Sequence, residues 1–350
     1  MSWARKPRVP KGAREWPAYK RNESVQHVIE MYEHGYAGTM YDEEARDVLF
    51  SSLPYPTGEQ AAYDFGLVDS GRGELSIPFV YAYRHYPKMW PCPGQTTGDC
   101  VSHAGANCGR VLIGVESELA EPDPITNKVE GYPEVSAEAE ANGVIATENI
   151  YGARGHSGEG ASCDRLINYV IRDGGLMLRQ NYPDLDIDFT EYNADYGIRW
   201  GSGGTPEKIN AVARQHQIRT STNVESEDVA RDFLANGYPL WACSDLGFSN
   251  KRDENGFSER SGSWAHSWIV MGYDDRKEIK DKYGEPLCLF CHDWAKWNSG
   301  GRRILGTNID IPEGTFWFRA SLLKKADLYA MSSIDGWPRR QLPNWSIGWN

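Results

Sequence analysis

The sequence predicts an α+β fold in which a mostly helical lobe faces a lobe built on an antiparallel sheet, with an N-terminal extension added. Helical patterns come first along the chain and strand-like patterns come last. The strand-like runs are apolar and rich in aromatic residues, and clusters of Gly, Asp and Asn separate them, as in antiparallel sheets. Because helices and strands are segregated along the chain, we expect them to form separate layers. The four expected strands lie at residues 238–246, 266–275, 287–294 and 314–323.

The longest expected helix begins at Cys100. Apolar side chains then recur at steps of three and four as far as Leu119, which is the spacing of an amphipathic helix. Three further helices are expected at residues 162–174, 205–216 and 226–237. Their expected N-terminal caps are Ser162, Thr205 and Ser226. Residues 76–90 are aromatic and strand-like, so a strand is expected directly before the Cys100 segment.

The composition argues against several classes of function. The 350 residues include 37 Lys and Arg against 49 Asp and Glu, a net charge of −12 that argues against specific nucleic-acid recognition. No apolar stretch is as long as a membrane span, and the first residues lack the apolar segment of a secretory signal, so a cytoplasmic location is expected. The seven cysteines are scattered and odd in number, which is not the pattern of a small disulfide-stapled domain.

A metal site was considered at Cys288 and Cys291. Their two-residue gap is that of a zinc knuckle, but a second pair at the matching distance is missing and the segment has the pattern of a buried strand. We therefore expect neither a metal ion nor a cofactor.

The first residues differ in charge from the rest of the chain. Residues 1–21 contain seven Lys or Arg and one Glu, a net charge of +6 that leaves −18 for the remainder. Such a segment is either a solvated tail or a tether to an acidic surface, which would be nucleic acid or an acidic partner. We accordingly expect a basic arm at residues 1–23, a mostly helical N-terminal region at 24–75 and the main domain at 76–350.

Cys100 and His266 are the candidate catalytic pair. The partial positive charge at a helix N-terminus lowers the pKa of a cysteine placed there and so favours the nucleophilic thiolate. Such a thiolate needs a base, and His266 opens an apolar strand that ends in Gly-Tyr-Asp-Asp. His103 is a competing partner, three residues after Cys100. The alternative readings are a buried structural thiol and an ordinary histidine at a strand end.

Four blocks of the sequence resemble, in order, the active-site blocks of papain-like cysteine peptidases. They are QTTGDCVSHA at 95–104, GEGASCDRLINYVIRDGG at 158–175, WAHSWIVMGYDD at 264–275, and HDWAKWNSGG with IPEGTFWFRASLL between 292 and 323. The resemblance covers about residues 76–325. It implies a two-lobed papain-like fold, hydrolysis of a peptide or protein substrate, and no cofactor.

The resemblance also implies roles for individual residues. Cys100 would be the nucleophile and His266 the base. Gln95 would donate a hydrogen bond to the oxyanion of the reacting carbonyl. Gly158 and Gly160 would let the substrate backbone approach closely, the alternative being an ordinary flexible loop.

This chain departs from the family pattern in two places. Four residues separate Gln95 from Cys100, where the family usually has five. At the third catalytic position the chain has His292, followed by Asp293, where the family has Asn and Ser. Either side chain can accept the second ring N–H of an imidazole, but alternation along a strand lets only one face the cleft. Alignment favours His292, Asp293 is the better chemical orienter, and both alternatives stay open.

Two functions are compatible with these residues. The first is a cysteine peptidase or amidase that acts through a thiolate–imidazolium pair of Cys100 and His266. The second is a catalytically inactive papain-like scaffold, a structural or docking component of a larger assembly such as a virion, attached through its basic arm. The retained Cys, His and Gln favour the enzyme, whereas the missing Asn favours the scaffold.

Overall fold

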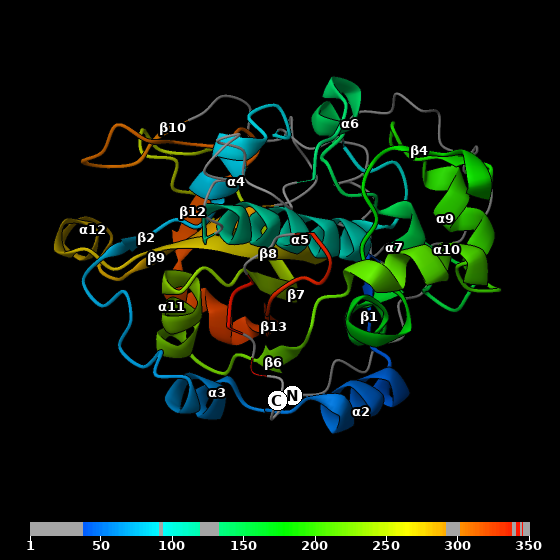
Figure 1. The fold of residues 1–350 in the computed structure, drawn as a ribbon. Helices are drawn as coiled ribbons and strands as arrows, with labels where there is room; N and C mark the ends of the chain where they lie inside the picture. The colour runs from blue at the N-terminus through cyan, green and yellow to red at the C-terminus, as the bar shows by residue number, and fades with distance from the viewer. Residues whose placement is uncertain are drawn as a thin grey trace, which may run out of the picture.

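The structure is a computed structural model of the chain, and it describes residues 38–90, 94–119, 133–291, 302–337, 341–343 and 345. It combines a group of helices with an antiparallel sheet, so the expected α+β class is confirmed (Figure 1). The long helix α5, Cys100–Leu119, lies across the centre of the molecule. The other α-helices are α2 at Glu43–Ser52, α3 at Gly58–Asp64, α4 at Phe79–His85, α6 at Ala137–Ala141, α7 at Glu148–Gly152, α8 at Cys163–Asn168, α9 at Ala194–Trp200, α10 at Glu207–Ala213, α11 at Glu227–Ala235 and α12 at Lys277–Tyr283.

Within the described residues, seven strands form one sheet whose neighbours are all antiparallel. Its order is β12-β9-β8-β7-β13-β6, and β2 pairs with β8. These strands are β2 at Leu75–Ser76, β6 at Ser221–Asn223, β7 at Leu240–Phe248, β8 at Arg260–Asp274, β9 at Leu287–Cys291, β12 at Phe316–Arg319 and β13 at Ala326–Met331. Short pairs are formed by β1 at Thr39–Met40 with β3 at Ala161–Ser162, β4 at Asn181–Tyr182 with β5 at Ile187–Asp188, and β10 at Arg302–Arg303 with β11 at Asp310–Ile311. All four expected strands are therefore present, as β7, β8, β9 and β12, but the last is shorter than expected because residues 320–323 belong to a 3-10 helix at Ala320–Lys325.

Helix α5 is buried on all sides. Eighteen of its 20 residues are buried, so the apolar face expected from the sequence is only part of its contact surface. It packs against α4 on one side and against β7 and β8 on the other (Figure 1). Glycine makes the closest approaches possible, because a Cβ atom at Gly105 would meet the Trp241 ring and one at Gly114 would meet the Ala82 backbone. The helix that begins at Cys100 is thus fixed on both sides.

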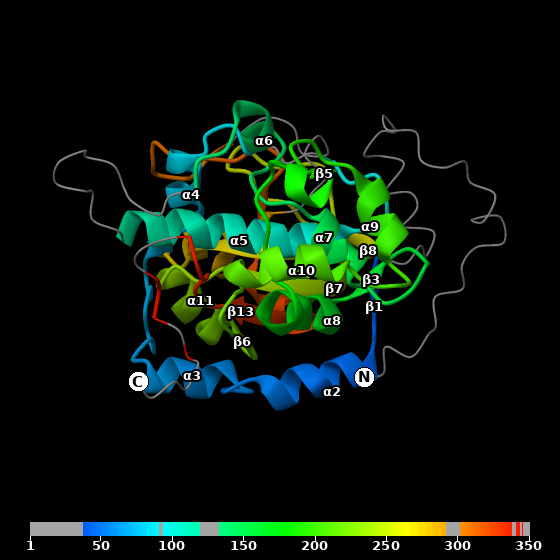
Figure 2. The same ribbon diagram turned by 45° about the vertical axis from the view of Figure 1, so that its right-hand side comes forward.

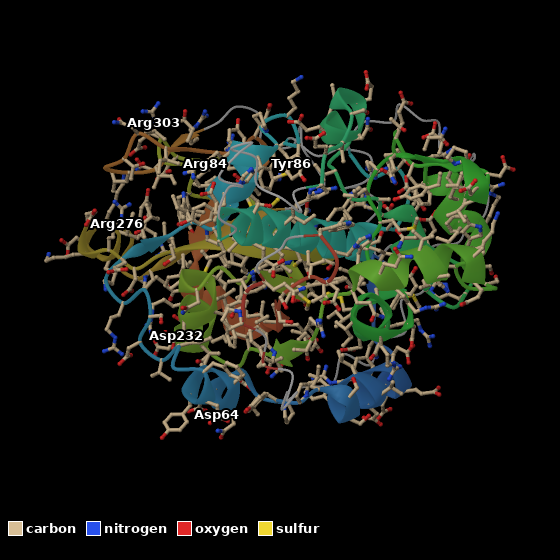
Figure 3. All side chains as sticks on the ribbon, in the orientation of Figure 1. Asp64, Arg84, Tyr86, Asp232, Arg276 and Arg303 are labelled. Atoms are coloured by element: carbon tan, nitrogen blue, oxygen red, sulfur yellow. A yellow bond between two sulfur atoms is a disulfide. The ribbon has the colours of Figure 1, made fainter. Side chains whose placement is uncertain are left out.

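The strand expected at residues 76–90 is wrong beyond Ser76, because the chain forms helix α4 at Phe79–His85. Pro78 directly precedes the helix, a position that proline favours. Within α4 the residues that reach the core follow a helical spacing, and packing against α5 outweighs the β preference of the aromatic side chains. Two side chains fix this end: Arg84 Nη1 donates to Glu118 Oε1 at 2.7 Å, and Tyr86 Oη donates to a backbone carbonyl oxygen at 2.7 Å (Figure 3).

We expect Gly114→Ala to lower the free energy of unfolding by about 1–3 kcal/mol, despite the gain of up to about 1 kcal/mol in helix propensity. The new Cβ would lie 2.3 Å from the Ala82 backbone, which cannot move aside as a side-chain end can. Urea denaturation measures the effect. Gly109→Ala is the matched control in the same helix, since its nearest neighbours are the terminal methyls of Ile145 and Leu176. Equal stabilities of the two variants would contradict the argument.

The short helices largely follow their local signals. Ser162 Oγ accepts from the backbone N–H of the third residue of α8, and Ser226 Oγ does the same for α11, so both expected caps are confirmed. A π-helical turn extends α8 as far as Asp173 before Gly174 ends it. The cap expected at Thr205 is wrong by one residue, because α10 is preceded by Pro206 and the Thr205 hydroxyl donates to Asn149 O at 2.6 Å. A tertiary partner has taken the hydroxyl that would have capped the helix.

Helices α2 and α3 lie along the base of the molecule, and the strands on either side of them, β1 and β2, rise to pair with β3 and β8 (Figures 1 and 2). Strand β1 pairs in parallel with β3, and Asn168 Nδ2 in α8 donates to Ala45 O in α2 at 3.0 Å. On the sheet side, Arg46 lies 3.5 Å from Asp327, and β2 pairs with β8. The basic arm and the start of the expected N-terminal region lie outside the described residues, and the expected boundary at residue 75 stays a prediction.

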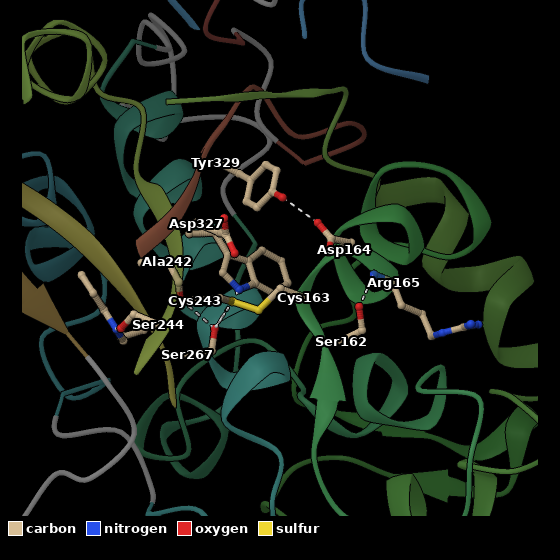
Figure 4. Close-up of a disulfide and its surroundings, with 12 residues drawn as sticks. Ser162, Cys163, Asp164, Arg165, Ala242, Cys243, Ser244, Ser267, Asp327 and Tyr329 are labelled. Carbon is tan, nitrogen blue, oxygen red and sulfur yellow. Dashed lines mark hydrogen bonds between the residues drawn. A yellow bond between two sulfur atoms is a disulfide. The ribbon is translucent and has the colours of Figure 1, made fainter. Parts of the chain in front are cut away.

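A disulfide joins the two parts of the fold. Cys163 at the start of α8 is bonded to Cys243 in β7, with Cα atoms 6.6 Å apart and a sequence separation of 80 (Figure 4). Next to it, Tyr329 in β13 donates from Oη to Asp164 Oδ1 at 2.5 Å, so a hydrogen bond accompanies the covalent link. The scattered cysteines gave no indication of this pairing. Disulfides persist mainly in oxidising compartments and are rare in cytosolic proteins. The disulfide is therefore unusual for the expected cytoplasmic location, which stays a prediction.

Among the helices that the structure describes, none has both the length and the apolar character needed to cross a membrane.

Candidate active site

Cys100 is the first residue of α5 and is fully buried. The preceding residue opens the helix, because Asp99 O accepts hydrogen bonds from the backbone N–H groups of Ser102 and His103 at 3.0 and 3.2 Å. The expected placement of Cys100 at a helix N-terminus is confirmed. This is the position at which the helix dipole favours a thiolate.

Helix α5 and strand β7 run in opposite directions past each other. A Cβ atom at Gly237, shortly before β7, would lie 2.8 Å from Val115 Cγ1, and one at Gly105 would lie 2.5 Å from the Trp241 ring. The two contacts lie ten residues apart along α5 and four residues apart along the chain that enters β7. Both separations correspond to a length of about 13–15 Å. These two contacts fix how positions on α5 correspond to positions on the sheet.

The same correspondence places Cys100 level with His266. Cys100 lies five residues beyond the second contact, about 7.5 Å, which corresponds to two or three further strand residues. This brings it level with Cys243 and Ser244. Across the ladder these residues pair with Ser267 and His266. By this spacing Cys100 and His266, which are 166 positions apart in sequence, lie at about the same level along α5 and the sheet.

The two faces of β8 divide the residues at this level. Ser267 lies on the α5 face, since its Oγ accepts from Trp241 Nε1 at 3.0 Å and Trp241 touches α5. Side-chain alternation puts His266 on the face of Trp268, whose Nε1 donates to Ser244 Oγ at 3.0 Å. The pairing of β7 with β8 becomes irregular just after Ser244. His266 is fully buried, and its pairing with the Cys100 thiol stays a prediction.

Gln95, the expected oxyanion donor, is buried in the loop before α5. Its Nε2 donates to Thr97 O, two residues on, at 2.6 Å, so its side chain braces the loop that leads into Cys100. The shorter spacing between Gln95 and Cys100 is accommodated by this compact turn, in which Asp99 N also donates to Thr97 O at 2.8 Å. Its role towards an oxyanion stays a prediction.

The Gly-rich loop at residues 154–160 contacts the loop at 95–99, here called the Cys100 loop, through Glu159, which the sequence pattern did not indicate as a site residue. Glu159 Oε2 accepts from Thr97 Oγ1 at 2.7 Å and from the backbone N–H of Gly98. Its neighbours were the expected substrate contacts. Gly160 has φ +80°, a backbone conformation that favours glycine whether or not a substrate binds nearby. The Gly158 carbonyl accepts a hydrogen bond from Arg154 Nε at 2.9 Å. Close approach of a substrate to either glycine stays a prediction.

A second unexpected group surrounds Asp99. Tyr192 Oη donates to Asp99 Oδ2 at 2.8 Å and accepts from Thr96 N at 3.2 Å. Burial, and then the Asp99 carboxylate, raise the pKa of Tyr192 well above its ordinary value, so the phenol keeps its proton and remains a donor. His103 lies beside the same carboxylate, with Nε2 3.4 Å from Asp99 Oδ2. His103 therefore has a local partner on its own helix.

His292 and Asp293, the two candidates for the third catalytic position, lie outside the described residues. Within the described ranges, no group of three or more His, Cys, Asp or Glu side chains is arranged to hold a metal ion. Cys288 and Cys291, considered above as a zinc pair, are both buried in β9.

Glu159 and Tyr192 had only weak signals in the sequence. Glu159 is a single acidic residue between two glycines, and Tyr192 is one of 19 tyrosines. Each acts on the Cys100 loop across 61 or more positions of sequence, a separation that local patterns do not encode.

No protein-family model matches the chain, and a search of curated proteins gave no match. Among solved structures, xylellain, a cysteine protease from Xylella fastidiosa, is 16% identical and covers 70% of this chain and 84% of its own, with a TM-score of 0.40. Digestive procathepsin L2 from Tenebrio molitor larval midgut is 14% identical and covers 91% and 85%, with a TM-score of 0.47. A procathepsin B from Trypanosoma congolense is 12% identical and covers 87% and 86%, with a TM-score of 0.40. The chain is similar to papain-like cysteine proteases at low identity.

Proposed function

We propose that the chain is a papain-like cysteine peptidase or amidase with Cys100 as nucleophile and His266 as base. One observation supports the proposal most: Cys100 is the first residue of a buried central helix that packs against β8, the strand that carries His266. The helix terminus supplies positive potential that favours the thiolate, and His266 in β8 would supply the base.

In the proposed reaction, the Cys100 thiolate attacks the carbonyl carbon of an amide. The C–N bond breaks as His266 gives its proton to the leaving amine, and an acyl-enzyme remains. Gln95 and the backbone N–H of Cys100 would donate to the oxyanion during this step. Water then attacks the thioester, with His266 taking its proton, and releases the acid and the thiolate. His292 or Asp293 would orient the imidazole.

A second function is favoured by the burial of the candidate pair. Cys100 and His266 both have 0% exposed surface, so a substrate reaches neither side chain in this conformation. A papain-like scaffold without activity, docked in a larger assembly through residues 1–21, is compatible with the burial of both side chains. In the enzyme, by contrast, opening of the site precedes substrate binding.

The pH dependence of thiol alkylation distinguishes the two functions. We expect iodoacetamide to label Cys100 at a rate that is nearly constant between pH 5 and 8, because a thiolate–imidazolium pair is already ionised there. In His266→Ala the rate should instead rise about tenfold per pH unit up to the ordinary thiol pKa of about 8.5. Peptide mass spectrometry reads the label.

Cys108 in the same helix is the matched internal control. It is fully buried, and burial raises the pKa of its thiol well above the ordinary value, so it should remain unlabelled across this range. Labelling of Cys100 only in the unfolded chain, or with the steep pH profile of a lone thiol, would overturn the proposal of a cysteine peptidase or amidase. The inactive scaffold would then be the remaining function.

A further inference from the structure

Glu159 connects two loops that the proposed reaction needs. It stands in the Gly-rich loop after α7, and its carboxylate reaches the loop that leads into Cys100. There a single oxygen, Oε2, accepts from Thr97 Oγ1 at 2.7 Å and from the backbone N–H of Gly98. Both donors are buried, at two and three residues before the nucleophile.

The loop that carries Glu159 is itself held rigidly. Arg154, only 2% exposed, donates from Nε to Gly158 O at 2.9 Å and from Nη1 to Gly197 O at 2.6 Å in α9. Its guanidinium also lies 4.1 Å from the centre of the Tyr151 ring. The position of the Glu159 carboxylate is therefore set by a buried arginine and by α9, elements remote from Cys100 in sequence.

The Thr97 segment bears on where the oxyanion donors lie. Thr97 O accepts from both Gln95 Nε2 and Asp99 N. Thr97 is therefore hydrogen-bonded both to Glu159 and to the side chain of Gln95. A displacement of Thr97 would carry the Gln95 amide and the backbone entering Cys100 with it. The loss of even 1 Å of alignment between donors and an oxyanion is costly in rate.

We propose that Glu159 is a positioning residue that fixes the loop 95–99, and with it the oxyanion donors beside Cys100. This inference rests on the proposed function. It assigns Glu159 no contact with substrate and no proton transfer. Its carboxylate acts only through Thr97 and Gly98.

Two reagents separate positioning from thiol reactivity. Iodoacetamide alkylates a thiolate by displacing iodide and forms no oxyanion. Acylation by p-nitrophenyl acetate passes through a tetrahedral oxyanion before p-nitrophenolate leaves, so it depends on the donors. In Glu159→Ala we expect acylation of Cys100 to fall at least tenfold while alkylation stays within about twofold of the unmodified chain. Global unfolding would instead change the alkylation rate and the acylation rate together.

Conservative replacement supplies the rescue. Glu159→Gln keeps a carbonyl oxygen that can accept from Thr97 Oγ1 and Gly98 N, so its acylation rate should lie within about threefold of the unmodified chain. Asp184→Ala removes an exposed carboxylate elsewhere in the chain and should leave both rates unchanged. Circular dichroism confirms that each variant is folded.

The outcomes distinguish this inference from the proposed function. A chain that is inert to both reagents would overturn the proposed function, and the inference with it. A reactive chain whose Glu159→Ala variant is acylated at the original rate would overturn the positioning role alone. Equal losses in the Ala and Gln variants would also overturn it, because they would make the charge rather than the hydrogen-bond geometry responsible.

Discussion

Replacing Cys163 and Cys243 together by alanine is expected to lower the free energy of unfolding by about 4 kcal/mol. The bond closes a loop of 80 residues, and a cross-link of that length removes much of the conformational entropy of the unfolded chain. It also joins α8 to β7, so its loss weakens the attachment of the helices to the sheet. Denaturant unfolding of the two proteins under oxidising conditions measures the difference.

Reduction provides the control for this prediction. Dithiothreitol should lower the unfolding midpoint of the unmodified chain towards that of the double variant and should leave the variant unchanged, because the variant has no bond at this position to reduce. A double variant that unfolds at the same denaturant concentration as the oxidised chain would show that the disulfide adds nothing.

The stability of the chain is expected to fall as the pH rises from about 4.5 to 8 because of Glu116. This carboxyl group in α5 is completely buried, and burial raises its pKa to about 8. The folded chain therefore binds this proton more tightly than the unfolded chain, so the stabilisation is complete below pH 4.5 and is lost by about pH 8. The loss should reach about 3–5 kcal/mol at 1.36 kcal/mol per pKa unit.

Glu116→Gln is expected to remove this pH dependence. The carboxyl oxygens accept from Leu342 N at 3.0 Å and Ile334 N at 3.3 Å, and so hold the C-terminal segment on α5. Gln keeps a carbonyl acceptor but cannot ionise, so the variant should be the more stable of the two above pH 8. Glu118→Gln, which changes a half-buried carboxylate two residues on, is the matched control and should keep the slope. Parallel stability curves for Glu116→Gln and the unmodified chain would contradict the assignment.

Local signals in the sequence were sufficient where a residue acts on its own neighbours. The start of α5 at Cys100, the serine caps of α8 and α11 and the four aromatic strands all follow from periodicity and from side chains that bond the nearest backbone groups. The same reasoning failed at residues 79–85 and at Thr205. In both places a distant partner, α5 or the Asn149 carbonyl, outweighed the local preference.

Local sequence patterns were enough to predict the fold class, the placement of Cys100 at a helix N-terminus and the strand that carries His266, because each depends on hydrogen bonds and apolar spacing within a few residues. The packing of the whole chain was needed to bring the helix that begins at Cys100 against the strand that carries His266, to pair Cys163 with Cys243, and to bring Glu159 to the loop before Cys100. These contacts join positions 60 to 170 residues apart. Which of many compatible residues meet at such distances is set by the packing of α5 between α4 and the sheet, a property of the whole chain.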